Sequence, residues 1–230
     1  MLSKCVVVFD LDDTLYYEID YLKSAYKEIS KEISKQAILP LKEEILFEEM
    51  MEEYVGKRDV FSVILKKYKI KDLTKDDLIR KYRNHKPKIT LSENRLEILR
   101  FLKENNVKIG IITDGRSITQ RHKIQTLKLD DFIEDPEDIV ISEEIGYEKP
   151  SKENYLFFEN KYKNENTKFF YIGDNTKKDF ITPNKFGWRT ICLIDEGFNI
   201  HKQDFGLKKE YLPHYKVKNI IEIKHLIFDF

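Results

Sequence analysis

The chain has 230 residues, of which 41% are hydrophobic, 13% aromatic and 36% charged. This length and composition suit one large α/β domain, or a core domain that carries a smaller insert, and they exclude wholesale disorder. Basic and acidic residues number 41 each, so the formal net charge of zero argues against a general nucleic-acid binder, which needs excess positive charge.

The N-terminal apolar run ends at Asp10, which is too early for the core of a signal peptide. Elsewhere, no apolar stretch reaches the roughly 20 residues that a transmembrane helix needs. Cys5 and Cys192 each lie in an apolar, β-branched run, so we expect two buried, reduced thiols. These features together predict a cytoplasmic protein that binds neither membranes nor nucleic acids.

Predicted strands alternate with predicted helices along most of the chain. The first strand, residues 6–9, is continuously apolar and β-branched, which is typical of a strand buried on both faces. The further strands are expected at 107–113, 138–142, 168–172 and 189–194, and the helices between them at 92–102, 116–127, 151–163 and 177–186. Such alternation predicts an α/β fold with a doubly wound parallel sheet.

Residues 16–87 interrupt this alternation. Apolar residues recur there at helical spacing, in three groups: Leu22, Tyr26, Ile29 and Ile33; Ile45, Met50 and Tyr54; Phe61, Ile64 and Leu65. A connection of roughly 70 residues is far longer than the usual loop of about 2–6 between strand and helix. We therefore predict a helical domain at 16–87, inserted into a core of residues 1–15 and 88–230, with 85–90 as the return hinge.

A cluster of acids, Asp10-Leu11-Asp12-Asp13-Thr14, directly follows the first strand. Carboxylates at the end of a buried strand are costly unless they are paired, hydrogen-bonded or bound to a metal. Two of them could divide the work of a nucleophile and of a general acid and base. The alternative is a helix N-cap, but a cap accounts for one or two of the three acids.

Thr113-Asp114-Gly115 follows the second strand, at a turn that could hold phosphate oxygens through a hydroxyl and backbone N–H groups. The alternative there is an ordinary capped turn. Lys149 precedes Pro150, so its backbone is biased to an extended form, and it could neutralise charge beside the acids. A solvated surface lysine is the alternative at that position.

Gly173-Asp174 ends the fourth strand, and Asp179 follows about one helical turn later. Because carboxylate oxygens are the ligands that magnesium prefers, Asp174 is a candidate metal ligand. A helix cap is again the alternative. Ligands collect at the carboxyl ends of strands in open α/β sheets, so the shared placement of these signals predicts one site.

In this order, the motifs Asp-x-Asp-x-Thr, Thr-Asp-Gly, Lys-Pro and Gly-Asp-x-x-x-x-Asp give the chain a resemblance to the haloacid dehalogenase-like hydrolase superfamily. The resemblance covers essentially the whole chain, and the stretches 120–124 and 139–146 share it. The insert after the first motif is similar to the helical C1-type cap of that superfamily. The resemblance implies a Mg²⁺-dependent phosphatase that acts on a small, soluble phosphate monoester, of the sugar phosphate or nucleotide class.

The resemblance also implies a role for each matching residue. Asp10 would be the nucleophile that forms an aspartyl-phosphate, and Asp12 the acid and base. Asp10, the backbone carbonyl of Asp12 and the side chain of Asp174 would hold magnesium. Four of the remaining positions would bind phosphate: Thr113, Asp114, Gly115 and Lys149. Lys149 would also neutralise charge, and Asp179 and Thr14 would support the site.

Two alternatives stay open. A dehalogenase on the same scaffold would use Asp10 to attack carbon, without a metal and without an acid at Asp12. A phospho-accepting receiver module also carries acids, Thr and Lys on a doubly wound sheet, but it is much shorter and has no helical insert. Four residues of the insert or its hinge could meet the leaving group, although core or solvated roles are the alternative: Tyr16, Tyr17, Lys57 and Arg58.

Overall fold

The computed structural model describes residues 5–36 and 41–228. Its contacts divide the chain into two compact units, Met1–Ile19 with Thr90–Phe230, called the core unit here, and Asp20–Ile89, called the helical unit. The domain boundaries that the sequence analysis places after residues 15 and 87 stay predictions.

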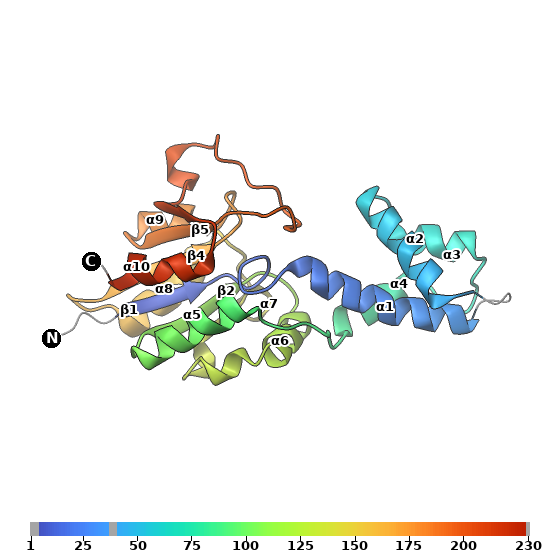
Figure 1. Ribbon diagram of the computed structural model, residues 1–230, viewed down its shortest axis with the longest axis horizontal. Coiled ribbons are helices and arrows are strands. Elements are labelled where there is room, and N and C mark those ends of the chain that lie inside the picture. The colour runs from blue at the N-terminus through green and yellow to red at the C-terminus, as the bar shows by residue number, and fades with distance from the viewer. Residues whose placement is uncertain (1–4, 37–40, 229–230) are drawn as a thin grey trace. The chain divides into compact units, whose positions relative to one another are not determined.

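The core unit contains a six-stranded sheet in the order β3-β2-β1-β4-β5-β6, with every neighbouring pair parallel. Figure 1 labels β1, β2, β4 and β5 of this sheet. Its strands are β1 (Cys5–Phe9), β2 (Lys108–Thr113), β3 (Ile139–Ile141), β4 (Lys168–Gly173), β5 (Arg189–Leu193) and β6 (Tyr215–Val217). Val7 of β1 pairs with Ile109 on one side and Phe170 on the other, so β1 lies in the middle of the sheet. The predicted α/β fold with a parallel sheet and a helical insertion is confirmed, while the three-residue β6 was not predicted.

Helices connect and cover these strands. They are α5 (Glu93–Glu104), α6 (Ser117–Thr126), α7 (Ser142–Ile145), α8 (Glu153–Tyr162), α9 (Ile181–Lys185) and α10 (Ile223–Phe228). The packing of α8 is close: Phe158 lies so near Gly110 of β2 that a Cβ on this glycine would be 2.3 Å from the ring. A side chain at Gly110 would therefore push α8 away from the sheet.

Helix α9 is shorter than the helix predicted over 177–186. Residues 175–180 form a turn instead, in which the N–H of Asp179 donates to the carbonyl of Asn175 at 3.0 Å. Pro183 is the third residue of α9, and a proline in a first turn removes no intrahelical hydrogen bond.

The helical unit consists of α1 (Glu18–Gln36), α2 (Glu43–Val55), α3 (Val60–Lys67) and α4 (Lys75–Asn84). All four apolar residues predicted on the first helix of the insert are buried in α1. On α2 the side chain of Ile45 is 46% exposed and the neighbouring Leu46 is buried, so Ile45 lies outside the buried face of this helix. At α4, Thr74 and Asp77 form a reciprocal capping box that satisfies two N–H groups at the start of the helix.

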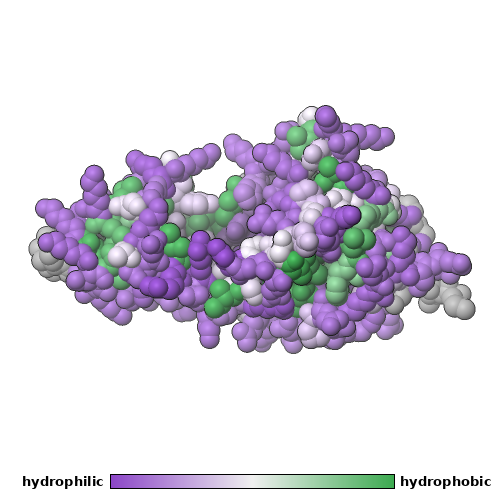
Figure 2. Space-filling model, turned by 180° about the vertical axis from the view of Figure 1, so that it is seen from behind, coloured by the Kyte–Doolittle hydropathy of each residue, from purple (hydrophilic) through white to green (hydrophobic). Residues whose placement is uncertain are grey.

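Cys192 is buried, as expected, but Cys5 is only partly covered because it opens the strand. Hydrophilic side chains predominate on the face shown in Figure 2, where apolar ones gather in small groups. Within residues 5–36 and 41–228, none of the helices combines the length and apolar character required to traverse a lipid bilayer.

Candidate active site

The predicted site residues of the core unit come together at the carboxyl edge of the sheet. β1 runs into Asp10, β2 into Asp114 and β4 into Asp174. Within the sheet, β2 and β3 follow on one side of strand β1, and β4, β5 and β6 follow on the other side of that strand. The strand order therefore reverses between β1 and β4, which makes this a topological switch point. Crevices at such points are the usual ligand sites of open α/β sheets.

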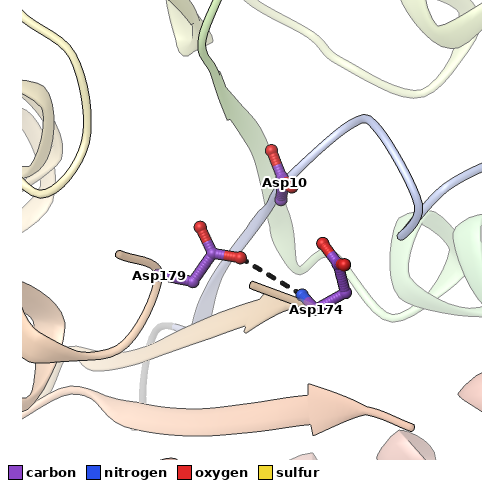
Figure 3. Close-up of side chains that lie close together, drawn as sticks. All are labelled: Asp10, Asp174 and Asp179. Atoms are coloured by element: carbon purple, nitrogen blue, oxygen red, sulfur yellow. Dashed lines mark hydrogen bonds between the residues drawn. The ribbon is translucent and has the colours of Figure 1, made fainter. Parts of the chain in front are cut away.

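Three buried carboxylates form the centre of the site. One oxygen from each of Asp10, Asp174 and Asp179 lies within 4.8 Å of the others, and the side chains converge from the ends of β1 and β4 and the turn after β4 (Figure 3). Burial raises the pKa of Asp10 to about 7, and burial with the charges of Asp179 and Asp10 raises that of Asp174 to about 9. This mutual repulsion, together with the hard oxygen donors, fits a site for a divalent cation such as Mg²⁺.

Asp179 is held by several donors, so it is less free to bind a metal than Asp10 or Asp174. Its Oδ2 accepts the backbone N–H of Asp174 at 3.2 Å and of Asn175 at 2.8 Å. A Cβ on Gly173 would lie 2.5 Å from this oxygen, so the carboxylate can reach the turn because residue 173 is a glycine. Asp179 therefore orders the turn that presents Asp174.

Lys149 is 5% exposed and lies against the acids. Its Nζ is 2.6 Å from Asp10 Oδ1 and 2.8 Å from Asp179 Oδ1, and it donates to the Tyr171 hydroxyl at 3.2 Å. Burial lowers the pKa of Lys149, but the charges of Asp10 and Asp179 outweigh this and raise it well above its ordinary value. Lys149 is therefore a fixed cation beside Asp10 rather than a solvated surface lysine.

The Thr113-Asp114-Gly115 turn lies next to these residues. Thr113 is buried, and its Oγ1 has no hydrogen-bond partner among the described residues. The Asp114 carboxylate accepts the N–H of Lys149 at 2.9 Å and Nζ of Lys178 at 2.5 Å. The N–H of Gly115 donates to Ser142 Oγ at 2.9 Å, so it would have to exchange this partner in order to bind a phosphate oxygen.

Asp12 points to a different set of groups. Nζ of Lys123 lies 2.7 Å from its Oδ1 and 2.9 Å from its Oδ2, and Gln120 and Tyr16 also donate to it. Burial opposes ionisation, but Lys123 and the hydrogen bonds outweigh it, so the pKa of Asp12 lies below its ordinary value. Gln120 and Lys123 are the partners that sequence reasoning left without a role, although they lie three residues apart on a predicted helix, a spacing that gives them one face.

Asp13 and Thr14 build the loop that carries Asp12. The Asp13 carboxylate accepts the N–H groups of Glu18 and Ile200, each at 2.8 Å, and the Thr14 carbonyl accepts Nε of Arg95 at 2.9 Å. These contacts are structural, and they tie the loop to distant segments of the core unit.

The four residues predicted to meet the leaving group have different surroundings. Tyr16 is buried and donates to Asp12, while Tyr17 donates to Glu196 at 3.0 Å and its ring lies under the Arg95 guanidinium. Lys57 and Arg58 belong to the helical unit, where both are exposed between α2 and α3.

A cleft of about 90 Å³ opens above the acids of the core unit. Its walls include Glu18 and His201, which no sequence motif indicated, and Lys178, which stands between Asp174 and Asp179 in a motif but was given no role. Asn199 donates from Nδ2 to Asp174 Oδ2 at 2.8 Å. Glu18, Asn199 and His201 come from segments outside the motifs, which is why local patterns did not reveal them.

Comparisons with known proteins agree with this geometry. The family described as haloacid dehalogenase-like hydrolase matches residues 7–193. A glyceraldehyde 3-phosphate phosphatase of Methanocaldococcus jannaschii is 28% identical over 236 residues, with 96% of each chain covered. The pyrimidine 5'-nucleotidase YjjG of Escherichia coli is 28% identical over 123 residues, which are 53% of this chain and 50% of YjjG.

Two solved structures are similar in fold. The HAD-hydrolase YfnB of Bacillus subtilis, described as bound to magnesium, has a TM-score of 0.64 at 18% identity and covers 99% of this chain and 100% of its own. A 2-haloacid dehalogenase of Pseudomonas syringae has a TM-score of 0.59 at 18% identity, with 98% of each chain covered.

Proposed function

This chain belongs to the haloacid dehalogenase-like hydrolase family and is a phosphatase of that family, and from this premise we propose that it hydrolyses a small phosphate monoester through a phosphorylated Asp10. The observation that carries the proposal is the convergence of Asp10, Asp174, Asp179 and Lys149 at one point of the sheet edge. This arrangement joins a carboxylate nucleophile, a fixed cation and a candidate cation site.

Asp10 is the nucleophile. Lys149 contacts its Oδ1 at 2.6 Å, which leaves Oδ2 for attack on phosphorus. In the first step an Asp10–phosphorus bond forms while the bond from phosphorus to the leaving oxygen breaks. In the second step a water oxygen attacks the same phosphorus and restores the Asp10 carboxylate.

Charge compensation is the main task of the site, since a dianionic phosphate must approach several carboxylates. Asp10, Asp174 and the backbone carbonyl of Asp12 would hold Mg²⁺, which supplies positive charge to the phosphoryl oxygens when bound. Lys149 supplies a second, permanent positive charge within reach of the same oxygens.

The phosphoryl oxygens would be held by Thr113 and by the backbone N–H groups of Asp114 and Gly115. The buried Thr113 Oγ1, without a partner among the described residues, supports this assignment because a buried hydroxyl is stabilised by a hydrogen bond. Asp12 is ionised in the free protein, so it must take up a proton before it can act as the acid. It then gives this proton to the leaving alkoxide in the first step and takes one from the attacking water in the second.

We propose a small sugar phosphate or nucleotide as substrate, in keeping with the names of the relatives. The first compounds to test are glyceraldehyde 3-phosphate and pyrimidine nucleoside monophosphates. Release of inorganic phosphate is measured with Mg²⁺, with EDTA, and with Asp10→Asn under the same conditions. Turnover that needs Mg²⁺ and Asp10 supports the proposal, and turnover that needs neither refutes it.

The dehalogenase alternative is tested beside the phosphatase reaction. A dehalogenase needs neither the acid at Asp12 nor the cation site around Asp174. Consumption of a 2-haloacid in the presence of EDTA, without phosphatase activity on the panel, would therefore replace the proposal.

A further inference from the structure

The carboxylate of Asp12 receives an unusual number of hydrogen bonds. Its Oδ1 accepts from the Tyr16 hydroxyl and from Nζ of Lys123 at 2.7 Å. Its Oδ2 accepts from Nζ of Lys123 at 2.9 Å and from Nε2 of Gln120 at 3.1 Å. An ionised carboxylate has about four lone-pair sites, so these four contacts occupy its whole acceptor capacity.

Lys123 is the donor that touches both oxygens. Its side chain is 3% exposed, and a buried ammonium is costly unless it is paired. The residue belongs to α6, one turn after Gln120, and both side chains reach Asp12 from that helix. The cost of burying Lys123 is thus offset by the one acid that the proposed reaction uses for proton transfer.

Gln120 connects this arrangement to the phosphate-binding turn. Its Nε2 donates to the Asp114 carbonyl at 2.7 Å as well as to Asp12. Helix α6 therefore holds the acid and the turn that would bind the phosphoryl oxygens in a fixed relation. Such a relation matters because proton transfer needs a donor within hydrogen-bond reach of the leaving oxygen.

We propose that Lys123 is a positioning residue that holds Asp12 in place during both proton transfers, an inference that rests on the proposed phosphatase reaction. A leaving-group oxygen or a water can meet Asp12 when Tyr16 or Gln120 gives up its contact. Lys123, bound to both oxygens, keeps the carboxylate group in place during that exchange. Asp12 takes up a proton from solvent water when Tyr16 or Gln120 gives way, and passes it to the leaving oxygen as the bond from that oxygen to phosphorus breaks. A proton from the attacking water returns to Asp12 in the second step.

The test compares Lys123→Met with Arg121→Met on two substrates, an alkyl phosphate and p-nitrophenyl phosphate, with Mg²⁺. Arg121 lies on the same helix and pairs with Glu144 at 2.6 Å, away from Asp12, so it controls for a lost cation on α6. We expect Lys123→Met to lower kcat for the alkyl ester by about 10- to 100-fold and for the aryl ester by less than about threefold, because an aryl leaving group needs little protonation. KM should change by less than about threefold for both, and Arg121→Met should leave both kcat values near wild type.

An equal loss of kcat on both esters, or no loss beyond that of Arg121→Met, overturns the proposal. If Lys123→Met does not fold, Lys123→Arg replaces it, since arginine keeps the buried charge but moves its N–H groups. The same selective loss for the alkyl ester, smaller in size, is then expected, and an unchanged ratio of the two kcat values overturns the proposal. Wild-type protein that hydrolyses neither ester overturns the proposed function itself, which separates that failure from a failure of the role of Lys123.

Discussion

Replacing Asp174 by Asn separates the metal-binding role of this residue from its role in stability. Asp174 is 3% exposed, and its pKa of about 9 means that it is protonated at pH 7 in the metal-free protein. Asparagine has the same shape and is also neutral, so we expect the metal-free stability at pH 7 to change by no more than about 1 kcal/mol.

The effect on magnesium binding should be large. At a Mg²⁺ concentration of 100 times Kd, binding stabilises the wild-type protein by about 2.7 kcal/mol. If Asp174→Asn weakens binding about 100-fold, the same concentration stabilises the variant by about 0.4 kcal/mol. For a chain of this size, the difference of about 2.3 kcal/mol corresponds to roughly 5–9 °C in Tm.

The assay is thermal unfolding of both proteins at pH 7, in EDTA and over a series of Mg²⁺ concentrations. We expect similar Tm values in EDTA and a Mg²⁺-dependent rise that is much larger in the wild type than in the variant at each concentration. A variant that gains as much from Mg²⁺ as the wild type would refute the assignment of Asp174 as a ligand.

Without metal, the folded state keeps the proton of Asp174 up to about pH 9, whereas the unfolded chain loses it near pH 3.8. The free energy of unfolding, measured by urea titration, should therefore fall as the pH rises from 5 to 9. A rise over this range would contradict the burial of this acid. Asp12→Asn should slow alkyl esters by about 100-fold or more and p-nitrophenyl phosphate much less, and equal losses in steady-state kcat would exclude acid catalysis there. Gly173→Ala should lower kcat more than about tenfold, because the new Cβ would lie 2.5 Å from Asp179 Oδ2 and would displace the turn that presents Asp174. Wild-type turnover by this variant would show that the close approach of Asp179 to residue 173 is dispensable.

Much of the sheet could be predicted because a strand buried on both faces leaves a local signal. The run at Val6–Phe9 is apolar throughout, and the acid that follows it stands at the sheet edge for purely local reasons. β6 carries no such signal, since it is three residues long and lies at the edge of the sheet with one exposed position. The helical spacing of Ile45, Met50 and Tyr54 predicted a helix but could not assign its buried face, and Leu46 takes the buried position beside Ile45.

The motif residues of the site were within reach of the sequence, but their partners were not. The contact between Asp12 and Lys123 spans 111 residues, and that between Asp13 and Ile200 spans 187. Chain separation of this size leaves no spacing pattern, so a buried lysine such as Lys123 looks like any solvated lysine in a chain rich in them. Geometry was needed to give it a partner.

The central claim is that Asp10 carries the phosphoryl group. Turnover of the best substrate from the panel is stopped with acid, and the phosphorylated peptide is located by mass spectrometry, with Asp10→Asn treated in parallel. We predict phosphate on Asp10 in the wild-type protein and none in the variant. Rapid turnover with the phosphate found on another residue, or undiminished turnover by Asp10→Asn, would contradict the account.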